Sequence, residues 1–226
     1  MSPMPPLGDL VRRYDPDRFF TSLFAPAGAR ESLWALYAFN HELARAREAV
    51  REPMMALIRL QWWREVVEGA RRRHEVAEPV GAALDRGALE GADLLALIEA
   101  READPPEDGA AWVEYVESTA GRLAAAAGRV LGSLPNPALA AAGAAYGASG
   151  VLRNRGLAGD SGIPELAAAG RRWLDQAATA RFSRSHVAAA LPAVFARRDL
   201  ARRMPVRDRG LGDKLAVMRA ALTGLV

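Results

Sequence analysis

The alternation of apolar and polar positions between residues 21 and 68 predicts two long helices. On the first, one apolar stripe recurs at spacings of three and four residues: Leu36, Phe39, Leu43, Ala46 and Val50. On the second, the stripe with the same spacing is Met54, Leu57, Ile58, Gln61, Trp62 and Glu65. Pro26 and Pro53 fall where the two helices would begin, and proline suits a first helical turn. We therefore expect this pair of helices to organise the chain.

The rest of the chain repeats the helical period. We expect further helices at about residues 15–24, 80–86, 90–102, 111–131 and 137–153. Two or three arginine-rich helices follow, with breaks near residues 191–192 and 204–205. The alternation of period two that marks a strand appears nowhere in the sequence. The prediction is an all-α fold in a single domain over residues 1–226, with residues 1–14 flexible.

Composition and charge narrow the kinds of site and of binding partner that this chain can have. The chain has no cysteine, so disulfides and thiolate metal sites are excluded. The net charge of +3 hides ten arginines between residues 171 and 209. Such a basic tract fits an anionic membrane surface, an acidic partner, nucleic acid or simply a solvated helix face. We favour the solvated face, expect no nucleic acid, and expect any binding to anionic vesicles to weaken with salt.

The sequence offers no membrane-spanning segment. Residues 1–8 lack the apolar core and basic run of a targeting peptide. The longest apolar run, residues 138–152, is too short to cross a bilayer. We therefore expect a cytoplasmic protein, with peripheral binding to the inner membrane left open.

Two motifs stand out in the sequence, ALYAFN at residues 35–40 and RLQWWRE at residues 59–65, with Ser22, Pro26 and Arg30 upstream. These motifs resemble those of the squalene/phytoene synthase family. Segments 74–84, 115–132 and 180–203 extend the resemblance over most of the chain. The resemblance implies the helical bundle of isoprenoid synthases, with a central cavity.

The family's metal-binding positions are altered in this chain. Active members condense two prenyl diphosphates with Mg²⁺, and Mg²⁺ needs carboxylate oxygens. The resemblance places the first Asp-rich motif on Ala44, Arg45, Ala46, Arg47 and Glu48. In the second motif, the family's Gln falls on Gly147, its Asn on Gly150, and its two Asp on Asn154 and Ala158. We therefore expect no catalytic residues, no metal site and no cofactor, with Mg²⁺ required only if the chain is an enzyme after all.

The residues that remain are candidates to line the cavity. We expect four residues of the first long helix to face four residues of the helix at 137–153: Tyr37, His41, Ala44 and Glu48 against Tyr146, Gly150, Arg153 and Asn154. Asn40 is a further candidate to line the cavity. We expect Arg153 to bind Glu48 or Glu42, because a buried charge needs a partner. The simpler interpretation of His41 is a hydrogen-bonded wall residue, and that of the Trp62–Trp63 pair is core packing.

Two functional hypotheses remain. The segment NHELA at residues 40–44 resembles a non-enzymatic branch of the family, the assembly factor of respiratory complex I. This resemblance implies a helper that binds a protein partner such as a respiratory complex subunit, with an anionic membrane or an isoprenoid or lipid ligand as further candidates. The alternative is an active head-to-head prenyltransferase of isoprenoid biosynthesis.

Overall fold

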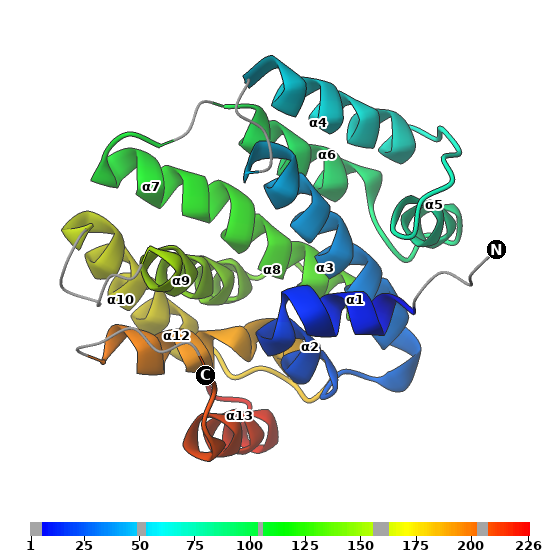
Figure 1. The fold of residues 1–226 in the computed structure, drawn as a ribbon. Coiled ribbons are helices and arrows are strands. Elements are labelled where there is room, and N and C mark those ends of the chain that lie inside the picture. The colour runs from blue at the N-terminus through cyan, green and yellow to red at the C-terminus, as the bar shows by residue number, and fades with distance from the viewer. Residues whose placement is uncertain (1–5, 49–52, 104–105, 156–162, 203–207) are drawn as a thin grey trace. The chain divides into compact units, whose positions relative to one another are not determined.

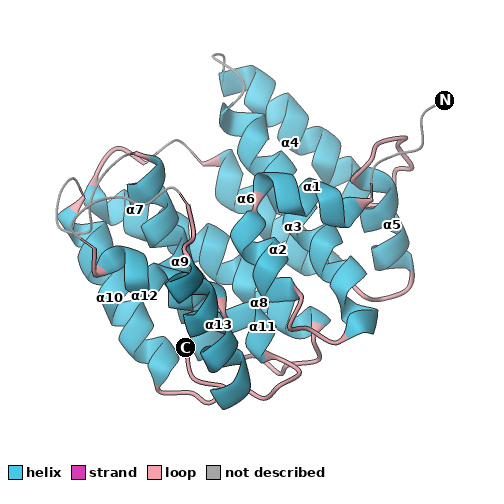
Figure 2. Ribbon diagram, turned by 60° about the horizontal axis from the view of Figure 1, so that its bottom comes forward, coloured by secondary structure: helices cyan, strands magenta, loops and turns pink. Residues whose placement is uncertain are grey.

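The computed structural model describes residues 6–48, 53–103, 106–155, 163–202 and 208–226. Every regular element in these ranges is a helix, as Figures 1 and 2 show. The prediction of an all-α fold is therefore confirmed. The chain divides into two compact units, Met1–Asp104 and Pro105–Val226.

The first unit is built around α3. Its helices are α1 (Leu7–Tyr14), α2 (Pro16–Ser22), α3 (Ala27–Glu48), α4 (Pro53–Val67), α5 (Ala77–Asp85) and α6 (Gly91–Glu102). The other five helices all contact α3. Leu36, Phe39 and Leu43 on α3 are fully buried, which confirms the predicted stripe as far as the described residues reach. Val50 lies outside them.

Helix α4 faces its neighbours with a different side from the one predicted. Met54, Leu57 and Ile58 are exposed. The buried side instead carries Ala56, Leu60, Trp63 and Val66. Both stripes are apolar and have helical spacing, so packing against α3, α5 and α6 decides between them. Trp63 is buried and Trp62 is half-buried, in agreement with the core-packing interpretation of this pair.

We expected residues 1–14 to be flexible, but most of the described part of this segment is helical. Leu7–Tyr14 forms α1, which contacts α2 and α3. Leu10 and Val11 are buried. The backbone at Gly8 lies close to the ring of Trp34, so that a Cβ there would come within 3.2 Å of it. Apolar burial therefore holds this helix in place.

The second unit is built around α9. Its α-helices are α7 (Gly109–Val116), α8 (Arg122–Val130), α9 (Pro137–Asn154), α10 (Pro164–Ala178), α11 (Val187–Ala190), α12 (Pro192–Leu200) and α13 (Leu211–Thr223). Helix α9 contacts α7, α8, α10, α11 and α12. It begins at a proline whose preceding residue, Asn136, caps it by accepting a hydrogen bond from the Ala138 N–H at 2.9 Å. The predicted break near residue 191 is confirmed, and the one near residue 204 lies outside the described residues.

The helix expected at residues 111–131 is interrupted. Glu117–Gly121 forms a π-helical turn, η1, between α7 and α8. The hydroxyls of Ser118 and Thr119 donate hydrogen bonds to the carbonyl oxygen of Tyr115 at 3.1 and 2.6 Å. Hydroxyl side chains that bond back to the preceding turn compete with the regular ladder, which gives a local reason for the irregularity. Helix α9 contacts this turn closely.

Candidate functional site

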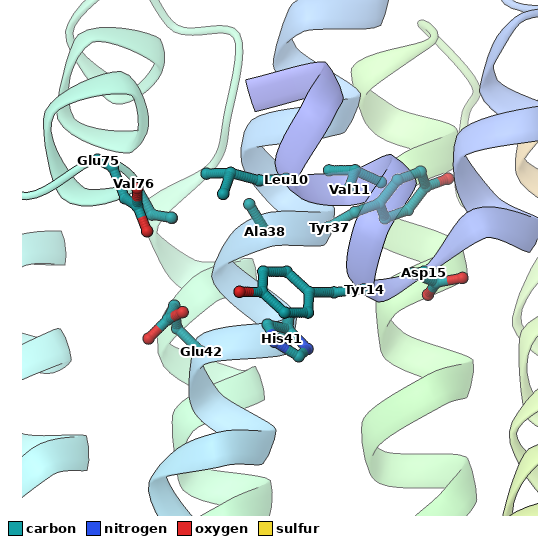
Figure 3. Close-up of a pocket in the computed structure, with 10 residues that line it drawn as sticks. All are labelled: Leu10, Val11, Tyr14, Asp15, Tyr37, Ala38, His41, Glu42, Glu75 and Val76. Carbon is teal, nitrogen blue, oxygen red and sulfur yellow. The ribbon is translucent and has the colours of Figure 1, made fainter. Parts of the chain in front are cut away.

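Two of the nine predicted cavity residues line a pocket in the first unit. Tyr37 and His41 of α3 form part of its wall, and the other described lining residues come from α1, α3 and the segments beside α2 and α5: Leu10, Val11, Tyr14, Asp15, Ala38, Glu42, Glu75 and Val76. The rings of Tyr14 and His41 stack with centroids 4.3 Å apart. In Figure 3 Glu42 and Glu75 lie on the opposite side of the pocket from Asp15. The pocket therefore combines an aromatic wall with carboxylates from three segments.

Tyr37 is the most perturbed titratable group of this pocket. Burial raises the pKa of Tyr37 to about 12, because the phenolate would lose its hydration. The Arg18 guanidinium, 5.7 Å from the ring centroid, lowers the pKa in part, and Asp15 raises it. Arg18 is itself held by Asp15 at 2.7 Å. Tyr37 therefore stays a neutral phenol at physiological pH.

The remaining α3 candidates have separate roles. Asn40 Oδ1 accepts a hydrogen bond from Arg101 Nη2 at 2.7 Å, so its side chain is bound to α6. Ala44 is half-buried. Arg45, which the resemblance places at a family Asp position, is bound to Glu42 at 3.3 Å. Glu48 ends α3, and its side chain lies outside the described residues.

The α9 candidates lie in the second unit. Tyr146 is buried, and Gly150 has no atom within 4 Å of the position that a Cβ would take. Arg153 forms an ion pair with Asp199 of α12 at 3.0 Å. Asn154 ends α9 and is exposed. The predicted pairing of Arg153 with Glu48 or Glu42 stays a prediction, as does the predicted facing of the α3 and α9 sets, because the two sets belong to different units.

Arg153 belongs to a cluster of arginines around two aspartates. Asp199 also binds Arg209 at 2.6 Å and Arg202 at 3.4 Å. Asp213 of α13 accepts hydrogen bonds from Arg198 and, at 2.7 Å, from Arg202. Part of the basic tract is thus engaged inside the second unit.

The protonation of Asp213 follows from this environment. Burial alone would raise its pKa, but the hydrogen bonds from Arg198 and from the Gly210 N–H, with the charge of Arg202, outweigh that effect. The pKa of Asp213 is therefore held below its ordinary value. The carboxylate stays ionised and ties α13 to α12.

The described side chains at the positions that the resemblance assigns to the family's metal ligands provide no carboxylate for Mg²⁺. They provide a methyl group at Ala44, a guanidinium at Arg45 and an amide at Asn154. Mg²⁺ is bound in proteins chiefly by carboxylate oxygens, and the neighbouring Glu42 is already bound by Arg45. In the described part of the chain no group of three or more His, Cys, Asp or Glu side chains is arranged to hold a metal ion. Ala158 of the second motif lies outside that part.

Sequence reasoning missed the residues that surround the candidates. Tyr14 and Arg18 contact His41 and Tyr37, and Asp199 binds Arg153. No motif marks Tyr14 or Asp199, because their partners are far away in the sequence. Asp15 had a local signal as the N-cap of α2, and it does accept a hydrogen bond from the Arg18 N–H at 3.0 Å.

None of the described helices has the length and apolar character needed to cross a membrane.

Comparison with known proteins adds sequence relatives. The proteins named NADH dehydrogenase (ubiquinone) complex I, assembly factor 6 from Homo sapiens and Rattus norvegicus are 34% and 36% identical to this chain over 98 residues. Each alignment covers 42% of this chain and 29% of the relative. The Mus musculus protein of that name is 30% identical over 123 residues, 51% of this chain and 37% of its own length. The chain thus spans about a third of the length of these curated relatives.

A solved structure and a family model complete the comparison. The crystal structure of a dehydrosqualene synthase in complex with ligand superposes with a TM-score of 0.66 at 13% identity, covering 96% of this chain and 94% of that chain. This likeness shows the isoprenoid synthase-type helical fold. The family model for squalene/phytoene synthase matches residues 11–159. The chain therefore belongs to the squalene/phytoene synthase family.

Proposed function

We propose that this chain is a non-catalytic member of its family that acts by binding a protein partner during the assembly of respiratory complex I. It needs no metal cofactor for this role. Its partner is a subunit or assembly intermediate of that complex. It works as a peripheral protein at the membrane where the complex is built.

The observation that carries the proposal is the chemistry of the metal-binding positions. Condensation of prenyl diphosphates requires divalent cations to neutralise several phosphate charges, and carboxylates must hold those cations. Here Ala44 and Arg45 replace two leading Asp, and Asn154 replaces a third. Arg45 brings a positive charge to a site that must bind positive ions, so the change opposes metal binding as well as removing ligands.

The relatives support the assembly role independently. Over an aligned segment of 98 residues the chain is 34–36% identical to the human and rat assembly factor 6 proteins. Packing also gives Arg153 a role in the fold. Arg153, which survives from the second motif, binds Asp199, an interaction that holds α9 to α12 without any diphosphate.

The experiment that tests the proposal is deletion of the gene in the organism that encodes it. We expect the amount of assembled complex I on native gels, and NADH-dependent quinone reduction in membranes, to fall. Squalene and carotenoid products in lipid extracts should remain at wild-type levels. Expression of the wild-type chain from a plasmid should restore complex I.

The alternative enzyme makes opposite predictions. Loss of an isoprenoid product with intact complex I would overturn the proposal. So would condensation of radiolabelled farnesyl or geranylgeranyl diphosphate by purified protein with Mg²⁺, above a heat-inactivated control. The two assays together separate a binding protein from a prenyltransferase that uses a displaced metal site.

A further inference from the structure

Helix α13 is fixed to the second unit by one face only. Asp213, Val217 and Ala220 are buried on that face, and the helix contacts α12. Its C-terminal end is held by backbone pairing, since Phe182 N–H donates to the Gly224 carbonyl oxygen at 2.8 Å. Gly224 adopts a left-handed conformation, with φ +72°, that closes the helix. The helix is therefore anchored at both ends.

The opposite face of α13 carries a continuous apolar stripe. Its members follow at spacings of four and three residues, with these exposed fractions: Leu211 80%, Leu215 63%, Met218 48% and Leu222 73%, followed beyond the helix by Leu225 at 52%. At about 100° per residue the four helical members fall within an arc of about 60°. A helix that is apolar on both of its faces is normally covered on both. This stripe, residues 211, 215, 218, 222 and 225, therefore marks a binding face.

Basic residues flank the stripe on both sides. Lys214 lies about 60° to one side of Leu211 on the helical wheel, and Arg219 about 80° to the other. Both are exposed. The one carboxylate of α13, Asp213, is buried and bound by Arg198 and Arg202. The exposed face of α13 is thus apolar at its centre and purely cationic at its edges.

We infer that α13 is an interfacial helix that docks this protein on an anionic lipid surface, with the stripe inserted at the headgroup and acyl boundary. An apolar face bordered by Lys and Arg is the pattern of helices that lie in the plane of a membrane. A second copy of the chain fits the charges less well. A symmetric contact through α13 would bring Lys214 and Arg219 of both copies together without an exposed carboxylate on either helix.

This site differs from the basic tract of residues 171–209, which the sequence suggested as a membrane surface. In that tract Arg198, Arg202 and Arg209 are bound to Asp199 or Asp213. Arg181 donates a hydrogen bond to the Thr223 carbonyl oxygen at 3.0 Å and adds a cation at the C-terminal end of α13. The inference stands whether or not the protein assists complex I.

The absence of cysteine allows a direct test. Leu222→Cys in the full chain is labelled with an environment-sensitive fluorophore, with Leu134→Cys, an exposed leucine between α8 and α9, as the matched control. We expect phosphatidylcholine vesicles containing about one third phosphatidylglycerol to blue-shift the label at 222 and leave that at 134 unchanged. Pure phosphatidylcholine vesicles should give a weaker response, and salt should weaken the anionic response.

Variants assign the contributions in a vesicle co-sedimentation assay. Leu215→Ser with Leu222→Ser should lower the partition coefficient at least about tenfold, because two apolar side chains no longer enter the acyl boundary. Lys214→Gln with Arg219→Gln should lower it for anionic vesicles by about fivefold per residue. The matched controls are Leu134→Ser and the exposed pair Arg12→Gln with Arg13→Gln, which should bind like the wild type.

Four results would overturn the inference. The first is absence of binding to anionic vesicles at low salt, and the second is binding that the α13 leucine variants leave unchanged. The third is a label response at 222 that follows protein concentration without vesicles. The last of these results would assign the stripe to a second copy. The fourth is a large fall in melting temperature for the leucine pair without lipid, because the stripe would then be covered by the chain itself.

Discussion

Helix α9 offers a matched pair of glycines for testing how closely it packs. The backbone at Gly147 approaches η1 and α7, and a Cβ built there would overlap the Ala120 Cβ and come within 2.9 Å of Val116 Cγ1. At Gly150, one turn further along the same helix, a Cβ would meet nothing within 4 Å. Gly147→Ala and Gly150→Ala therefore make the same chemical change in two different environments.

The expected effects have opposite signs. Replacing Gly by Ala inside a helix stabilises it by roughly 0.5–1 kcal/mol, because alanine loses less backbone entropy. Gly150→Ala should gain this amount. At Gly147 the gain is opposed by overpacking, which costs about 1–3 kcal/mol when backbone must move. The Ala120 Cβ is fixed to backbone, so we expect Gly147→Ala to lose about 1–2 kcal/mol.

Urea unfolding followed by far-UV circular dichroism at neutral pH measures both variants. Because the two glycines belong to one helix, the same transition reports on both. The free energies of unfolding should differ by about 2 kcal/mol, which is a difference of several degrees in melting temperature for a chain of this size. Equal stabilisation by both substitutions would show that α9 does not approach η1 as closely as the structure has it. Gly147→Gln, which restores the family residue, should be less stable than Gly147→Ala.

Three further predictions concern charge and metal. Asp213→Asn should lower the free energy of unfolding by about 2 kcal/mol at pH 7, because Arg198 loses its carboxylate. The pKa of Asp213 is lowered on folding. The stability that the Asp213 carboxylate contributes is therefore present above its unfolded pKa of about 3.9 and is lost as pH falls through the lower folded pKa. Urea unfolding curves of the wild type and of Asp213→Asn that fail to converge in acid would contradict the assignment. Tyr37 should ionise with a pKa of about 12, so Tyr37→Phe should remove the phase near that pH from an ultraviolet titration. The stability linked to the neutral Tyr37 phenol is present below about pH 10 and is lost as pH rises towards 12. A Tyr37→Phe variant whose titration is unchanged from the wild type would refute the burial of Tyr37. Ala44→Asp with Asn154→Asp should raise the melting temperature on addition of Mg²⁺ if the two positions face each other, while either single variant should not, and no response from the double variant would count against the predicted cavity.

The helices themselves follow from local sequence, with two instructive exceptions. Asp15 and Asn136 cap the starts of α2 and α9, each followed by a proline, and these signals act within a few residues. Helix α1 was missed because residues 7–14 carry only a short apolar pattern, which becomes stable by packing on α3. The π-helical turn was missed because Ser118 and Thr119 reveal their hydrogen bonds to the Tyr115 carbonyl only once the helix is built.

The candidate site was also predictable from the sequence only in part. Sequence alone placed Tyr37 and His41 on one face of α3, and the pocket contains both. The resemblance also places Ala44, Arg45 and Asn154 at the family's Asp positions, and the absence of a carboxylate at each of them can be seen in the sequence itself. The loss of the metal site stays a prediction. The sequence did not identify the Tyr14 ring on His41 or the Asp199 carboxylate on Arg153, 46 residues away.

The sequence by itself determined the helical class and the family motifs. Helical period and capping depend on neighbours within four residues, so they can be read along the chain. The tertiary structure alone decided which of the two apolar stripes of α4 is buried, why the pKa of Tyr37 rises, and that α13 leaves its leucines exposed. Each of these depends on burial, and burial is set by segments distant in sequence whose packing no local pattern records.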